Sequence, residues 1–271
     1  MRVSVKLNQF LNLLAFLIMV AFNYLANALP LHGVTTGQIA KEFPSKFSPA
    51  GFTFSIWGVI YSFLTIFIIY QIFLMFQEKA RNNIYIQRIG LWFPISCLLN
   101  IAWLWTWHLR LIGISFVLIL SLLFVLITIY KRLKICKGSY KVTNRILFYI
   151  PFSLYTSWIS VASVANLFAL ANYYHLNVLG IRESLWVQFS LVILASVGVI
   201  VLLKRKDFPF ILVYIFAYFG VLWERISVGF HDNFGIIVAA TFGIWIMISA
   251  SVYHFMKIRL KIPKQRLLYK K

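Results

Sequence analysis

The sequence predicts an all-α fold, a polytopic transmembrane helical bundle of about eight spans. Of its 271 residues, 62% are hydrophobic and only 12% are charged, whereas a soluble domain is usually about half apolar and about a quarter charged. Apolar runs of about twenty residues, the length that a helix needs to cross a bilayer, recur along the chain. A lipid solvent accommodates this composition, because the outer surface of a membrane protein is itself apolar.

Eight apolar runs follow one another with no low-complexity linker or long soluble domain between them. The seventh run is the shortest. The expected spans are 8–29, 51–76, 89–108, 112–130, 146–171, 185–203, 208–223 and 234–256.

The first run has two interpretations. Arg2 and Lys6 precede an apolar stretch that ends in small residues around Ala28, which is similar to a secretory signal with a cleavage site. The stretch is long for a signal and carries polar residues such as Asn12 and Asn23. We therefore expect a retained span and keep cleavage as the alternative.

The longest segment between spans, residues 30–50, is rich in Pro, Gly and Thr, so we do not expect it to be helical throughout. A connection of this length inside a compact bundle is often functional, for example as a lid. Its apolar residues Ile39, Phe43 and Phe47 favour packing against the bundle over a disordered connector.

The distribution of Lys and Arg predicts the orientation. With the N-terminus inside, 21 of the 26 basic residues lie in inside segments, and five lie outside: Lys41, Lys46, Arg110, Arg182 and Arg225. This asymmetry predicts a multi-pass protein of the cell membrane with both termini in the cytoplasm, and it requires an even number of spans.

The net charge of +20 does not indicate nucleic acid. Because the basic residues lie beside membrane exits, we expect their partner to be the anionic headgroups of the lipid bilayer. The densest run is the predicted cytoplasmic tail, 257–271. Cys97 lies in a span and Cys136 in a basic loop, without metal-like spacing, so both are interpreted as free thiols.

Catalytic and metal-binding motifs are not visible. The six acidic residues all lie in loops or at span ends, whereas carboxylates inside spans are typical of ion pathways. There is no His-Glu-x-x-His pattern. We therefore expect no metal site, no catalytic residues and no conventional enzyme activity.

One polar group follows the seventh span. Glu224 and Arg225 lie at its end, with His231 and Asp232 nearby. We expect interfacial salt bridges among them, and the alternative is the gate of a transporter.

Aromatic and amide side chains share faces of the second, third and fifth spans. A buried amide in lipid needs a hydrogen-bond partner, so these faces should point into the bundle. An inward cluster of this kind suits a flat apolar ligand with a few polar atoms, and pure packing is the alternative. By helical spacing the residues are Trp57 and Tyr61, then Asn100, Trp103 and Trp107, then Tyr155, Trp158 and Asn166.

Tryptophans near span ends are typical of the aromatic belts at membrane interfaces. This interpretation suits Trp92, Trp107, Trp186 and Trp223. It suits Trp103 and Trp158 less well, because both lie deeper and share faces with amides.

Three motifs on these faces resemble the tryptophan-rich sensory protein family, also called translocator protein or peripheral benzodiazepine receptor. Residues 47–61 (FSPAGFTFSIWGVIY) resemble its loop-to-second-helix motif, and residues 99–103 (LNIAW) its third-helix motif. Residues 151–158 (PFSLYTSW), followed by Asn166, resemble its fifth-helix motif. The stretch 23–30, with the Thr-Thr-Gly after it, looks like a longer branch of the family.

The resemblance covers about residues 8–172 and implies a five-helix bundle whose first loop roofs a pocket. Members bind porphyrins, haem-like tetrapyrroles, sterols and aromatic drugs, and the family is linked to light-dependent porphyrin breakdown. The chain departs from the pattern at Pro49-Ala50, where the family has Pro-Pro, and in the longer fifth-helix spacing. By position, the implied ligand-binding residues are Trp57, Tyr61, Asn100, Trp103, Trp158 and Asn166.

Two functions follow. The first is a sensor, receptor or carrier that binds a hydrophobic small molecule, for example a porphyrin or haem-like ligand, under the 30–50 loop. The alternative is a small-solute transporter that uses all eight spans. We expect a five-span ligand-binding unit at 1–180, three additional spans at 181–256 and a basic tail at 257–271. A homodimer is compatible with either function, and nucleic acid is not an expected partner.

Overall fold

The computed structural model describes residues 5–28, 33–77, 83–135, 141–176 and 180–268, with side chains up to Lys257. Cys136, Glu78 and the side chains of the basic tail after Lys257 lie outside the described residues. The long helices are α1 (Val5–Asn27), α3 (Ile56–Met75), α5 (Trp92–His108), α6 (Ile112–Leu133), α8 (Ile150–Tyr173), α9 (Glu183–Arg205), α10 (Phe208–Val228) and α11 (Phe234–Leu268). The short ones are α2 (Thr36–Glu42), η2 (Gly51–Ser55), α4 (Ile84–Ile89), α7 (Val142–Asn144), η4 (Arg145–Tyr149) and η6 (His231–Asn233).

Seven of the helical segments are long and apolar enough to cross a membrane, which confirms a multi-pass helical bundle. The third expected span is shorter than these seven. Its helix α5 has 17 residues, because Gly90, with φ of +51°, separates it from α4. The count of eight spans therefore stays a prediction. At the other end of the chain, α11 continues to Leu268, past the expected edge at residue 256.

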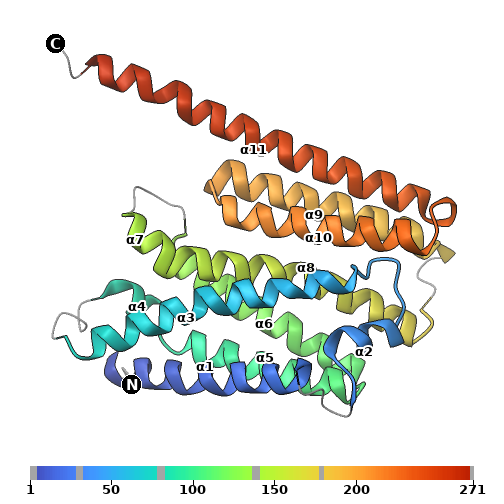
Figure 1. Cartoon of the computed structure of the whole chain (residues 1–271), viewed down its shortest axis with the longest axis horizontal. Coiled ribbons are helices and arrows are strands. Elements are labelled where there is room, and N and C mark those ends of the chain that lie inside the picture. Colours follow the sequence, from blue (N-terminus) through green and yellow to red (C-terminus); the bar gives the residue numbers. More distant parts are fainter. Residues whose placement is uncertain (1–4, 29–32, 78–82, 136–140, 177–179, 269–271) are drawn as a thin grey trace.

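The helices form two packed groups (Figure 1). In the first group, α5 packs against α1 and α6, while α8 packs against α3 and α6. The second group consists of α9, α10 and α11, which contact one another. Helix α10 joins the groups by packing against α8, so α8 lies at the centre of the molecule.

Helix α8 is buried on all sides in its first half, where every residue from Pro151 to Ile159 is buried. Burial on all sides is expected of a helix at the centre of a bundle, and the polar residues on it must find partners. Its serines face α10: Ser157 Oγ donates to the Phe210 carbonyl at 2.7 Å, and the Ser160 and Tyr214 hydroxyls are 2.8 Å apart. Small residues at this interface allow the two backbones to approach closely.

Amide side chains hold α1 in the bundle. Asn12 Nδ2 donates to Gln71 Oε1 of α3 at 2.9 Å, and Asn23 Nδ2 donates to Asn100 Oδ1 of α5 at 2.8 Å. Amide pairs of this kind contribute to helix association in lipid. That the first run is retained rather than cleaved stays a prediction.

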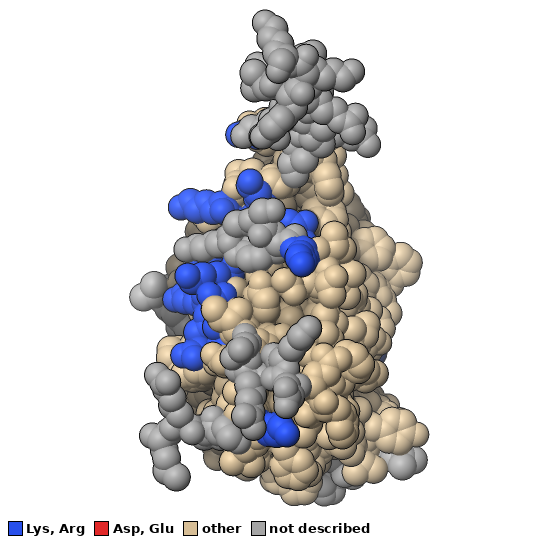
Figure 2. All heavy atoms as spheres, turned by 90° about the vertical axis from the view of Figure 1, so that its left-hand side faces the viewer, with Lys and Arg blue, Asp and Glu red and all other residues tan. Residues whose placement is uncertain are grey.

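The ends of the bundle differ in charge. Helix α1 begins and α11 ends at the same end (Figure 1). Lys and Arg side chains gather over this end, and among the described residues no acidic side chain is visible on it (Figure 2). Exposed examples are Lys131, Lys134 and Lys204, at the ends of α6 and α9. The sides of the bundle expose large apolar residues such as Phe124 and Trp245, as lipid contact requires. That the basic end faces the cytoplasm stays a prediction.

Candidate functional site

At the opposite end, residues 33–50 form a roof over the bundle. Its helix α2 begins with a capping box in which the Thr35 and Gln38 side chains each accept a backbone N–H of the other residue. Ile39 and Phe47 are fully buried, and Phe47 stacks on Phe168 of α8 at a centroid distance of 5.5 Å. The predicted packing of this segment against the bundle is therefore confirmed.

Polar contacts tie the roof to several helices. Arg110, after α5, donates two hydrogen bonds of 2.8 Å to the Glu42 carboxylate, and this contact raises the pKa of Arg110. The Lys46 backbone N–H donates to Glu183 Oε1 of α9 at 2.8 Å. Trp107 Nε1 donates to the Thr36 carbonyl at 3.3 Å. The roof is thus held from both helix groups.

Beneath the roof lies a small inner aromatic cavity of about 50 Å³. Indoles from three helices meet around it: the Trp57 ring of α3 lies 6.3 Å from both Trp103 of α5 and Trp158 of α8. Phe54 contacts Trp158 edge to face at 6.2 Å and also lines the cavity. Asn166 of α8 completes the wall.

The polar atoms of this wall are only partly paired. Trp103 Nε1 donates to Asn166 Oδ1 at 3.2 Å, and Asn166 Nδ2 donates to the Ala162 carbonyl at 3.0 Å. The buried Trp158 Nε1 has no acceptor among the described residues. Since buried polar groups are nearly always hydrogen-bonded, this N–H is available to an acceptor on a ligand.

An α1-side cavity of about 370 Å³ adjoins the first. The two cavities share Trp57, Trp103 and Phe54 in their walls. On the α1 side Trp57 stacks on Tyr61 with a centroid distance of 5.3 Å. The remaining wall comes largely from α1 and includes Asn23, Tyr24 and Asn27.

The structure brings five of the six residues implied by the resemblance to these two cavities. The five are Trp57, Tyr61, Trp103, Trp158 and Asn166. Asn100 lines neither cavity. It is fully buried and pairs with Asn23 of α1.

The belt interpretation was wrong for Trp107. Its side chain is 4% exposed and lines the inner cavity, because the roof covers this end of α5. Trp223, at 56% exposed, fits a belt. Phe54 was not among the expected site residues although it lines both cavities, and its position three residues before Trp57 was the available signal.

The expected salt bridges after the seventh span are also wrong. Among the described residues the ion pair is Arg110–Glu42, and none joins Glu224, Arg225, His231 or Asp232. His231 and Asp232 are exposed on η6, whereas Arg225 turns inward beneath the roof. The residues are therefore split between the surface and the interior.

The model of one protein family, described as TSPO-like protein, matches residues 9–256. The chain belongs to the TSPO-like family. The TSPO-like match extends through α9, α10 and most of α11, so it includes the three helices beyond the expected five-span unit. No curated protein and no solved structure matches the chain.

Proposed function

We propose that this TSPO-like chain binds a flat apolar ligand, such as a porphyrin or another tetrapyrrole, and acts as a membrane sensor or carrier. One observation carries the proposal: indoles from α3, α5 and α8 meet beneath a roof that several helices hold in place. Stacking on these rings would supply contact area, while Trp158 Nε1 and the Asn166 amide would orient the polar atoms of the ligand. No covalent step is involved.

The size of the cavities implies movement on binding. Pockets for drug-sized ligands measure about 300–1,000 Å³, and the inner aromatic cavity holds about 50 Å³. We infer that the ligand enters through the α1-side cavity, which holds about 370 Å³, and displaces Phe54 from between the two. The structure then corresponds to the closed, unliganded state, and small-solute transport stays the alternative function.

The test is a titration of the purified protein in discs of zwitterionic lipid with a porphyrin, followed by the shift of its absorption band. We expect saturable binding of one porphyrin per chain. Phe54→Ala removes a wall of both cavities and should weaken binding severalfold. Phe242→Ala, which alters a ring 62% exposed on α11, is the matched control and should have no effect. Failure of wild-type protein to bind any planar aromatic compound would contradict the proposal.

A further inference from the structure

An outer polar cavity of about 400 Å³ lies between the roof and the end of α10. It is separate from the indole cluster but shares a wall with the inner aromatic cavity, formed by Ala40, Ser48, Pro49 and Phe54. Its lining contains three cationic side chains, Lys41, Lys46 and Arg225, and two acidic ones, Glu183 and Glu224. A compound that fills the inner cavity could therefore extend a substituent into a site with an excess of positive charge.

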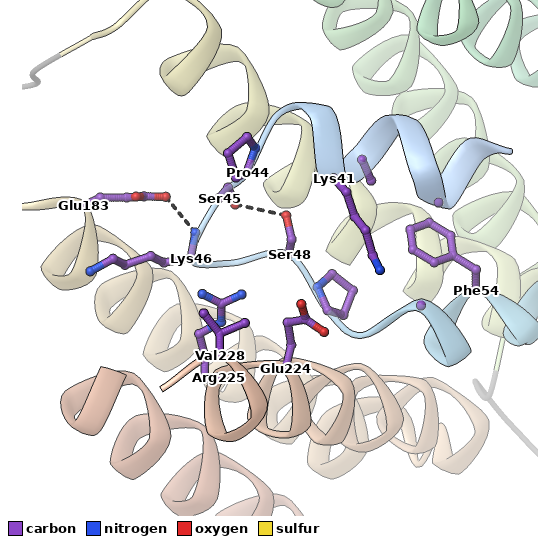
Figure 3. A pocket seen from close by; sticks show the side chains of 14 residues that line it. Lys41, Pro44, Ser45, Lys46, Ser48, Phe54, Glu183, Glu224, Arg225 and Val228 are labelled. Atoms are coloured by element: carbon purple, nitrogen blue, oxygen red, sulfur yellow. Dashed lines mark hydrogen bonds between the residues drawn. The ribbon is translucent and has the colours of Figure 1, made fainter. Parts of the chain in front are cut away.

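Arg225 is the distinctive group of this cavity. Its side chain rises from α10 toward the roof segment between Lys46 and Ser48 (Figure 3), and Lys41 of α2 lines the same cavity. It is only 8% exposed, and its Nε is buried without an acceptor among the described residues. Buried arginines are normally paired, because removing an uncompensated charge from water is unfavourable.

The neighbouring carboxylates attract Arg225 electrostatically, but they do not bind its guanidinium. No ion pair joins Arg225 to Glu183 or Glu224 in the described part of the chain. Glu183 Oε1 is already occupied, since it accepts the Lys46 N–H at 2.8 Å and Asn172 Nδ2 at 3.3 Å. The position of Arg225 in the last turn of α10 favours a positive charge, but it supplies no acceptor for the buried Nε.

We propose that Arg225 and the outer polar cavity form an anion-binding subsite, which takes the carboxylate of an amphiphilic ligand whose apolar body lies in the adjoining aromatic cavity. A guanidinium suits this role because its fork of donors matches the two oxygens of a carboxylate. The subsite rests on the proposed function and narrows the ligand to flat apolar compounds that carry an acidic side arm. It also gives α10 a direct part in recognition.

The experiment compares a porphyrin dicarboxylic acid with its dimethyl ester, by quenching of tryptophan fluorescence in discs of zwitterionic lipid. We expect wild type to bind the diacid about tenfold more tightly than the diester, equivalent to ~1.4 kcal/mol. Arg225→Gln should abolish this preference and leave diester binding unchanged, which also shows that the variant is folded. Arg182→Gln, at an exposed arginine on the same end and outside the cavity lining, should keep the full preference.

Arg225→Lys keeps the charge without the fork and should retain only part of the preference. If Arg225→Gln does not fold, the test depends on Arg225→Lys. A severalfold decrease in its preference for the diacid over the diester supports the subsite. An unchanged preference overturns it. Equal affinity of wild type for diacid and diester overturns the subsite while leaving the proposed function intact. Binding of neither compound overturns both.

Discussion

Asn100 connects two helices rather than lining a cavity, since its Oδ1 accepts from Asn23 Nδ2 at 2.8 Å. Asn100→Leu removes this interhelical bond and leaves Asn23 with the Met19 carbonyl as its acceptor. We expect a loss of about 1 kcal/mol in the free energy of unfolding, with little change in ligand affinity. Unfolding in mixed micelles measures the loss. Thr65→Val, at an exposed position, serves as control, and a variant as stable as wild type would contradict this role.

Asp207 caps α10 from within the basic end of the bundle, where its carboxylate accepts from Tyr130 and Ser153 at 2.7 Å. Burial raises its pKa, against the opposing effect of these hydrogen bonds. A raised pKa means that the folded state favours the protonated carboxyl. Its contribution to stability is therefore complete below the ordinary aspartate pKa and is lost as the pH rises through the raised one.

We expect Asp207 to lower the melting temperature of wild type as the pH rises above roughly 4, the ordinary pKa of aspartate. Asp207→Asn should remove this decrease, because an asparagine side chain cannot ionise. Asp232→Asn, at an exposed residue of η6, should leave the pH profile unchanged. Thermal unfolding at several pH values measures how the melting temperature changes with pH. Identical pH profiles for wild type and Asp207→Asn would show that Asp207 does not cause the decrease.

At the scale of residues, helical spacing predicted that Trp57, Trp103 and Trp158 converge. It did not predict that Asn100, on the same face as Trp103, lines neither cavity. It failed where a neighbour outside the helix decides the environment. Trp107 is buried because the roof covers it, and Arg225 points inward because α10 packs under the roof. Neither contact leaves a pattern within the helix itself.

Close contact between η2 and α10 fixes the position of the roof. The Ala50 N–H donates to the Gly220 carbonyl at 3.0 Å, and a Cβ added at Gly220 would lie 2.1 Å from Thr53 Oγ1. Gly220→Ala should therefore displace the roof and destabilise the protein by about 1–3 kcal/mol. Thermal unfolding measures the effect.

Two further variants make this prediction specific. Thr53→Ala in the Gly220→Ala background removes the clashing atoms and should restore much of the stability. Gly58→Ala, where an added Cβ meets nothing within 4 Å, should not destabilise the protein. If Gly220→Ala is as stable as Gly58→Ala, the close approach does not exist.

At the scale of elements, the length and hydropathy of the runs predicted most of the helices. Helix α2 was not predicted, although Thr35 and Gln38 carry the sequence signature of a capping box. The break in the helix at Gly90 was also not predicted. A glycine inside an apolar run is compatible with a continuous span, and only its positive φ shows that the helix is interrupted there.

For the molecule as a whole, the basic end of the bundle predicts the orientation. Reporter fusions after Lys141 and after Lys271 should be cytoplasmic, and a fusion after Gly180 should be external. Reporters that require one compartment or the other provide the measurement. An external C-terminus would contradict the topology.

The expected division into residues 1–180 and 181–256 stays a prediction. Contacts cross this boundary at the roof, where Glu183 accepts from Lys46 and Gly220 packs on Thr53. Sequence periodicity could not predict these contacts, because they join segments more than 130 residues apart. The ligand unit that we propose therefore includes the ends of α9 and α10.

The central claim is that a planar ligand lies among the indoles of α3, α5 and α8, and a quenching titration with a porphyrin tests it most directly. A porphyrin bound there should quench wild-type tryptophan fluorescence strongly and saturably. Trp57→Phe and Trp158→Phe should each weaken binding modestly, because a benzene ring replaces a larger indole and its donor. Trp245→Phe, at a residue 70% exposed on α11, should bind like wild type. The account is contradicted if Trp245→Phe weakens binding as much as the other two variants, or if wild type shows no saturable quenching.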